Sequence, residues 1–165
     1  MSPLNTHAQT LPGTWTLTDY RARSDDGSNP LFPLGPNPRG IIIYTDAGSV
    51  AVHLMKPGAP HVNSPTPHDG PDDELAQAMR HSLAYAGSYT LQPMENNNEC
   101  FIINHQVDVA LFPNWVGGLQ SRVGRFEHDG GERLVLEAQT KFPFQGTWYT
   151  SVLTWERATK RPVLG

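Results

Sequence analysis

The residue best suited to moving a proton is His105, which lies in a long stretch that alternates like a β-strand. Along residues 100–111, His105 is the only polar residue on a face otherwise made of Phe101, Ile103, Val107, Val109 and Leu111. An imidazole titrates near neutral pH, so a His105 that faces an apolar cavity would be a candidate general acid or base. The alternative is a core histidine whose ring nitrogens are satisfied by backbone or hydroxyl groups.

A charged pair, Asp108 and Arg122, offers a second kind of chemistry on neighbouring strands. An inward Asp108 would need a partner such as Arg122, because an unpaired buried carboxylate changes its pKa rather than remaining charged. An inward pair of this kind would bind a carboxylate, a phenol or an enolate through the guanidinium. The alternative is an ion pair on the outer surface, which would contribute less than about 1 kcal/mol to stability.

Other side chains could assist these groups. His53 shares a strand face with Ala51 and Met55 and is the second candidate for acid–base chemistry, although a half-exposed surface histidine is the commoner situation. Tyrosines on strands could donate a hydroxyl to a ligand carbonyl, and three lie in such positions: Tyr44, Tyr89 and Tyr149.

The turn that follows the His105 strand carries large aromatic residues. Phe112 and Trp115 precede Gly117-Gly118, after which the chain returns as a second strand. We expect the two aromatic rings either to cap a flat ligand or to plug one end of the fold. The expected ligand contacts are therefore Tyr44, Phe112, Trp115, Tyr89, Phe101 and Met55.

The sequence offers little support for metal or covalent chemistry. None of the seven histidines has the i, i+4 helical spacing of a zinc site, and the single cysteine excludes a Cys-x-x-Cys pair. There is no Gly-x-Ser-x-Gly elbow and no Walker loop. Cys100 has no positively charged neighbour that would favour a thiolate. We therefore expect no metal and no cofactor.

The elements that position these residues are many short strands. Fifteen Gly and fifteen Pro predict many turns. Strand patterns occur at 14–23, 40–45, 49–55, 88–92, 100–111, 119–128, 133–138 and 146–157, and a helix is expected from Asp72 to about Tyr85. We predict a mainly β fold, a single antiparallel barrel of about eight strands with one inserted α-helix. Residues 40–45 are apolar on both faces, so we expect a helix to cover that strand.

The remaining boundaries and the overall charge narrow the class of protein. We expect a flexible arm at 1–10, the barrel at 11–158 and a tail at 159–165. A net charge of −4 makes nucleic acid an improbable partner, and the chain has no apolar run long enough for a membrane span. A lone cysteine suits the cytoplasm. A closed barrel has few exposed sheet edges, and the sequence is compatible with two oligomeric states, a monomer and a homodimer.

Several segments resemble a known family. Gly13-Thr14-Trp15, with Arg157 at the end of the last strand, resembles the lipocalin pattern, in which a first-strand Trp packs against an Arg. Three longer segments resemble the lipocalin-like domain proteins of bacteria and filamentous fungi: PNPRGIIIYT at 36–45, LAYAGSYTL at 83–91 and LFPNWVG at 111–117. The resemblance implies a barrel sealed at one end by a cation–π contact between Trp15 and Arg157.

The family resemblance implies a small hydrophobic ligand in the lumen of the barrel. Members often lie beside natural-product pathways, and related barrels act as binders or as cofactor-free cyclases and isomerases. Our first hypothesis is an isomerase or cyclase acting on a polyketide- or terpenoid-type intermediate, which the barrel would fold into a reactive conformer. His105 or His53 would move the proton, while Tyr149 or Arg122 would polarise a carbonyl. The alternatives are a non-catalytic carrier and a haem-binding barrel with an axial histidine.

Overall fold

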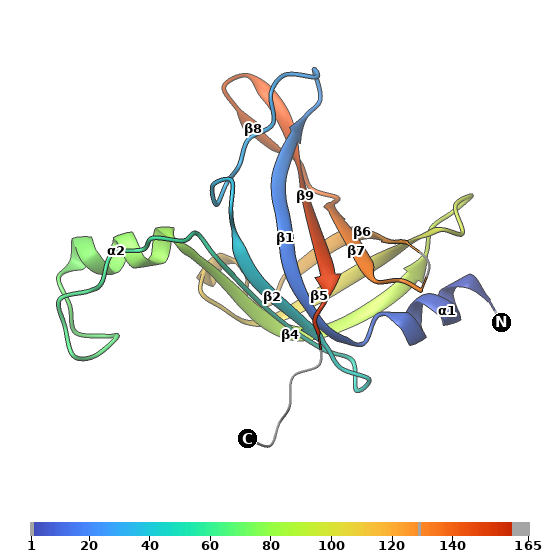
Figure 1. Cartoon of the computed structure of the whole chain (residues 1–165), viewed down its shortest axis with the longest axis horizontal. Coiled ribbons are helices and arrows are strands. Elements are labelled where there is room, and N and C mark those ends of the chain that lie inside the picture. The colour runs from blue at the N-terminus through green and yellow to red at the C-terminus, as the bar shows by residue number, and fades with distance from the viewer. Residues whose placement is uncertain (1, 129, 160–165) are drawn as a thin grey trace.

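The chain forms a closed antiparallel β-barrel in the computed structural model, which describes residues 2–128 and 130–159 (Figure 1). Eight strands run around the barrel in the order β1-β2-β3-β4-β5-β6-β7-β9, and β1 pairs with β9 to close it. A short ninth strand, β8, pairs with the first residues of β9, before the part of β9 that pairs with β7. The predicted single antiparallel barrel of about eight strands is therefore confirmed.

The bounds of the predicted strands agree well with the structure outside the segment at 72–93, whereas α1, η1 and β8 were not predicted. The strands are β1 (Gly13–Ser24), β2 (Arg39–Tyr44), β3 (Ser49–Met55), β4 (Ser82–Pro93), β5 (Cys100–Ala110), β6 (Leu119–Glu127), β7 (Arg133–Ala138), β8 (Phe142–Phe144) and β9 (Thr147–Arg157). The helices are α1 (Pro3–Thr10), α2 (Asp72–Arg80) and a 3-10 turn, η1 (Pro113–Trp115). No helix within the described residues is both long and apolar enough to cross a membrane.

One end of the barrel is closed around Trp15. The Trp15 side chain is fully buried, and its indole N–H donates to the Leu11 carbonyl at 3.0 Å. The Arg157 guanidinium lies 4.1 Å from the centre of the indole ring and donates to the carbonyls of Thr10 and Pro12. The predicted contact between Trp15 and Arg157 is confirmed, and it ties the first and last strands together.

The N-terminal segment is a helix rather than the loose arm that the sequence suggested. Ser2 caps α1 by accepting a hydrogen bond from the Asn5 amide, and Pro3 occupies the first helical position. Leu4 packs against the core, and His7 lies against the buried Phe101 ring. The helix is short and polar, so its stability comes from this docking on the closed end. Residues 160–165 of the expected tail lie outside the described residues.

The expected helix at 72–85 is shorter, because its last part belongs to a strand. α2 ends at Arg80, and β4 pairs with β3 without interruption from Met55↔Ser82 to Ser49↔Ser88. None of the residues of α2 is buried, and Figure 1 shows the helix projecting away from the barrel. The prediction that a helix covers β2 is therefore wrong, since Ile41 and Ile43 remain 41% and 37% exposed on the outer face.

A β-bulge between β4 and β5 changes which side chains of β5 face inward. Gly87 pairs with Val107 and Ala86 with Val109, so Asp108 is an extra residue in β5. Before the bulge, Phe101, His105 and Val107 are buried; after it, Val109 is 62% exposed. The sequence pattern placed Val109 and Leu111 on the His105 face, and this is wrong because the bulge reverses the alternation.

Candidate functional site

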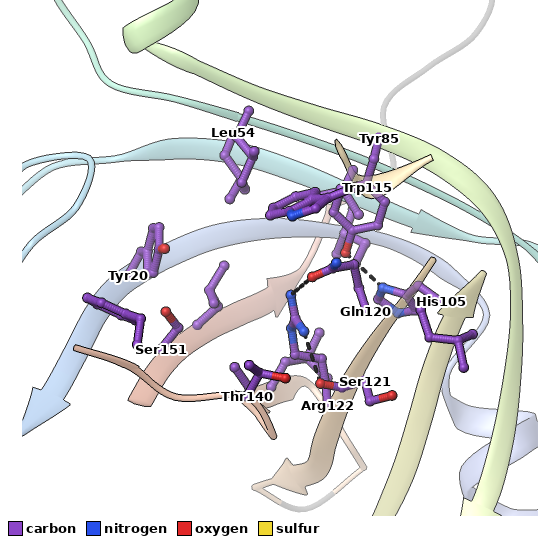
Figure 2. A pocket seen from close by; sticks show the side chains of 18 of the residues that line it. Tyr20, Leu54, Tyr85, His105, Trp115, Gln120, Ser121, Arg122, Thr140 and Ser151 are labelled. Carbon is purple, nitrogen blue, oxygen red and sulfur yellow. Dashed lines mark hydrogen bonds between the residues drawn. The ribbon is translucent and has the colours of Figure 1, made fainter. Parts of the chain in front are cut away.

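A cavity of about 360 Å³ lies inside the barrel, and neither Trp15 nor Arg157 lines it (Figure 2). Aliphatic and aromatic side chains from β2, β3, β4, β7 and β9 form most of its wall. Its polar lining consists of Tyr20, Tyr85, His105, Gln120, Ser121, Arg122, Thr140, Lys141 and Ser151. The volume falls in the range of pockets that enclose one small organic molecule.

The pairing of β5 with β6 brings the main polar groups to one side of this cavity. Residues directly opposite each other on antiparallel strands point to the same face of the sheet. His105 pairs with Gln120, and Ile103 pairs with Arg122. Because His105 and Ile103 are buried, Gln120 and Arg122 point to the same inward face of the sheet. Figure 2 shows His105, Gln120 and Arg122 gathered on one side of the cavity, away from Tyr20 and Ser151.

His105 is held between two tyrosine hydroxyls. Its Nε2 lies 2.9 Å from the Tyr44 hydroxyl and its Nδ1 lies 2.8 Å from the Tyr85 hydroxyl. The three side chains are 1%, 1% and 7% exposed for His105, Tyr44 and Tyr85. Both ring nitrogens are therefore occupied inside the protein, which agrees with the alternative that His105 is a core histidine satisfied by hydroxyl groups.

Burial sets the charge state of these three side chains. Burial, and to a smaller extent the nearby positive charge of Arg122, lowers the pKa of His105 to about 3, so the imidazole is neutral at physiological pH. Burial also raises the pKa of the Tyr44 and Tyr85 hydroxyls, against a smaller opposite effect of Arg122. A neutral imidazole that both tyrosines engage is a weak base, and it is poorly placed to take a proton from a ligand.

Arg122 brings a positive charge into the cavity without a carboxylate beside it. Its guanidinium donates to the Ser121 carbonyl at 2.9 Å and to the Gln120 side-chain oxygen at 3.3 Å. Among the described residues it takes part in none of the ion pairs within 4.0 Å. The expected partner, Asp108, is exposed on the outer side of the bulge, so the hypothesis of an inward or outward Asp108–Arg122 pair is wrong.

Trp115 closes part of the cavity from the 3-10 turn η1. Its ring meets the Tyr85 ring edge to face at 5.6 Å and the Phe112 ring at 5.8 Å. Trp115 lines the cavity, whereas Phe112 is 39% exposed and lies behind it. The aromatic turn therefore contributes one wall to the cavity.

The remaining candidates from the sequence lie away from the cavity. His53 and Met55 are exposed on the outer face of β3, because Val52 and Leu54 take the inward positions. Phe101 is buried at the closed end beside His7. Other candidates pack around the cavity without lining it: Tyr44 behind His105, Tyr89 against Tyr44, and Tyr149 stacked on Phe142.

The sequence reasoning missed most of the residues that line the cavity, and Tyr85, Gln120 and Trp155 show why. Tyr85 was assigned to a helix, although LAYAGSYTL also fits a strand. Gln120 is two positions before Arg122, and the period of two could have placed both on the inward face. Trp155 is buried in the wall, and its indole N–H has no acceptor among the described residues. No sequence signal distinguished it from a core residue.

The described residues do not favour a metal or haem site. They contain no group of three His, Cys, Asp or Glu side chains that could hold a metal ion. Axial ligation of haem iron by His105 would require one ring nitrogen to give up a buried tyrosine. The site therefore fits a ligand held by hydrogen bonds and apolar contact.

The fold and the enclosed cavity define a member of the lipocalin class, and comparison with known proteins agrees. A family model described as a lipocalin-like domain matches residues 12–158, and the chain belongs to this family. It is similar to the 4'-hydroxy-3'-methoxypropiophenone carrier protein ppsC of Aspergillus oryzae. The two are 35% identical over 111 residues, which cover 66% of this chain and 96% of that protein.

This relative corrects our first functional hypothesis. The isomerase or cyclase that we expected has no counterpart in the comparison, because the relative is named as a carrier protein. The state of His105 points in the same direction, since the proposed acid–base group is neutral and bound on both sides. The carrier, which the sequence left as the alternative, is the better supported hypothesis.

Proposed function

We propose that this protein is a non-catalytic carrier that encloses one small phenolic aryl ketone in its barrel. The observation that carries the proposal is a cavity with largely apolar walls, in which the one histidine among the described lining residues is neutral and hydrogen-bonded on both ring nitrogens. Such a cavity can hold a flat aromatic molecule by apolar contact and orient it by a few polar groups. Among the described lining residues, neither an Asp, a Glu nor a free imidazole is available as a general base.

The size and chemistry of the cavity support a ligand of the kind named for the relative. A volume of about 360 Å³ accommodates a single substituted benzene ring with a short acyl chain. Trp115 and Tyr85 provide aromatic surfaces for the ring, and Leu54 and Leu136 provide aliphatic wall. The named ligand of the relative, a hydroxy-methoxy propiophenone, combines an aromatic ring with oxygen acceptors.

The first test is direct binding of 4'-hydroxy-3'-methoxypropiophenone to the purified full chain. Trp115 and Trp155 both line the cavity, so an occupied cavity is expected to quench tryptophan fluorescence in a saturable way. Mass spectrometry of the released compound is expected to show the starting material. A saturable signal with unchanged ligand supports the carrier. The absence of saturable binding, or the release of an altered compound, would refute it.

A matched pair of variants locates the bound ligand. Ser151→Trp places an indole in the cavity from β9, and it is expected to reduce binding at least tenfold by occupying the ligand volume. Thr16→Trp adds the same side chain to the exposed outer face of β1, and we expect wild-type affinity. Equal loss in both variants, or in neither, would show that the ligand binds outside the barrel.

A further inference from the structure

The hydrogen-bond pattern around His105 determines which of its two ring nitrogens carries the proton. A neutral imidazole has one N–H donor and one acceptor nitrogen, so one tyrosine donates to the ring and the other accepts from it. Tyr44 is fully buried and does not line the cavity, and among the described residues its hydroxyl has His105 Nε2 as its hydrogen-bond partner. Tyr44 must therefore donate to Nε2, because its O–H would otherwise be buried without an acceptor.

The consequence reaches the cavity through Tyr85. With Nε2 accepting from Tyr44, the proton lies on Nδ1 and is donated to the Tyr85 oxygen at 2.8 Å. The Tyr85 O–H then has no acceptor among the described residues, and Tyr85 lines the cavity. A hydroxyl that already accepts one hydrogen bond is a stronger donor for the next. The chain Tyr44–His105–Tyr85 thus presents a polarised donor to whatever occupies the cavity.

The neighbouring polar groups are also donors. Arg122 has five N–H groups, of which two are used by the Ser121 carbonyl and the Gln120 side-chain oxygen. Because Gln120 points its oxygen at Arg122, its amide N–H groups are left without a partner in the described part of the chain. Figure 2 shows Tyr85, Gln120 and Arg122 converging on the same side of the cavity. This side therefore offers hydrogen-bond donors from three residues: Tyr85 on β4, and Gln120 and Arg122 on β6.

The electrostatics of the cavity favour a negatively charged occupant. The titratable or charged groups that line it are Tyr20, Tyr85, His105, Arg122 and Lys141, and no Asp or Glu occurs among the described lining residues. Lys141 is already paired with Asp25 at 2.7 Å. The charge of Arg122 is the one left uncompensated, and it acts on both His105 and Tyr85.

We propose that Tyr85, Gln120 and Arg122 form an oxyanion subsite that binds the ligand's phenol as its phenolate. The proposal rests on the carrier function and specifies how the ligand is oriented, with its phenolic oxygen toward β6 and its acyl chain toward the mouth. A phenolate accepts from all three residues and compensates the positive charge of Arg122, whereas a neutral phenol leaves that charge uncompensated.

The test compares 4'-hydroxy-3'-methoxypropiophenone with its 4'-methyl ether, which cannot ionise. A para-acyl phenolate absorbs at longer wavelength than the phenol, so the ionisation of the bound ligand can be followed directly by absorbance between about pH 5 and pH 9. In the wild type we expect the phenol's pKa to fall by at least about one unit on binding, because an opposite charge at close range lowers a pKa by about 1–3 units. The methyl ether is expected to bind at least tenfold more weakly above that pKa.

Variants separate the charge from the shape of the subsite. Arg122→Gln is expected to abolish the pKa shift, and a far-ultraviolet circular dichroism spectrum like that of the wild type checks that the variant folds. Arg122→Lys keeps the charge and is expected to retain a downward shift. Tyr85→Phe removes one neutral donor and is expected to reduce the shift without abolishing it.

The outcomes distinguish this inference from the carrier function. If both compounds bind and the phenol titrates at or above its free value, the oxyanion subsite is refuted while the carrier function stands. An unchanged shift in Arg122→Gln would equally refute it. If neither compound binds saturably, the carrier function fails and the subsite fails with it.

Discussion

The neutral, buried state of His105 makes a quantitative prediction about stability and pH. The pKa of His105 is lowered from the ordinary value of 6.5 to about 3, so between these values the unfolded chain binds a proton that the folded protein does not. Stability contributed by a group with a lowered pKa is fully present above pH 6.5 and is lost as the pH falls toward 3. The slope approaches about 1.4 kcal/mol per pH unit, which gives about 2 kcal/mol between pH 6.5 and pH 4.5.

The perturbation that isolates this effect is His105→Gln, because glutamine keeps an amide between the two tyrosines but does not titrate. The variant is expected to be less stable at pH 7 by about 1–3 kcal/mol, since one of the two hydrogen bonds to Tyr44 and Tyr85 is lost or weakened. The difference between the variant and the wild type should then shrink as the pH falls. All other titrating groups are common to both proteins and cancel in the comparison.

Urea unfolding followed by tryptophan fluorescence at pH 7, 6, 5 and 4.5 measures the free energy of unfolding of both proteins. The reasoning is refuted if the two proteins lose stability with the same slope below pH 6.5. It is refuted as well if the wild type becomes more stable in acid, because a charged, stabilised His105 would have that effect.

Two further predictions concern the barrel that holds the site, both measured by urea unfolding. Trp15→Ala should destabilise the protein by about 3–5 kcal/mol, because it removes a fully buried indole and its contact with Arg157; a cost below about 1 kcal/mol would contradict the packing described. Gly87→Ala should lower the free energy of unfolding by at least about 1–3 kcal/mol, because the added methyl group would meet the Gln106 carbonyl oxygen at the bulge. A Gly87→Ala variant as stable as the wild type would show that the bulge lies elsewhere.

The change from a catalytic to a carrier interpretation depends on the partners of His105 rather than on its position. The sequence pattern put this histidine on the apolar face of its strand, and the structure buries it. A buried histidine is a plausible acid or base only while one ring nitrogen is free to reach a ligand. Tyr44 and Tyr85 come from β2 and β4, far from His105 in the chain, and they occupy both nitrogens.

Local pattern was sufficient to predict most of the architecture. Strand-forming segments bounded by turn residues marked the strands that form β1, β2, β3, β5, β6, β7 and β9. The positions of Trp15 and Arg157 indicated the closed end. These features depend on residues close in sequence or on a pair with a distinctive chemistry, so they can be recognised without knowing the strand pairing.

The site itself required the tertiary structure, because it depends on register. The sequence alone determined a lipocalin-like barrel and a strand on which His105 shares the apolar face. Only the folded chain decided that Tyr85 belongs to β4, that the bulge turns Asp108 outward, and that Arg122 enters the cavity without a carboxylate. A shift of one residue between paired strands reverses which side chains face inward. That register is set by contacts between distant strands, and no local pattern of residues contains it.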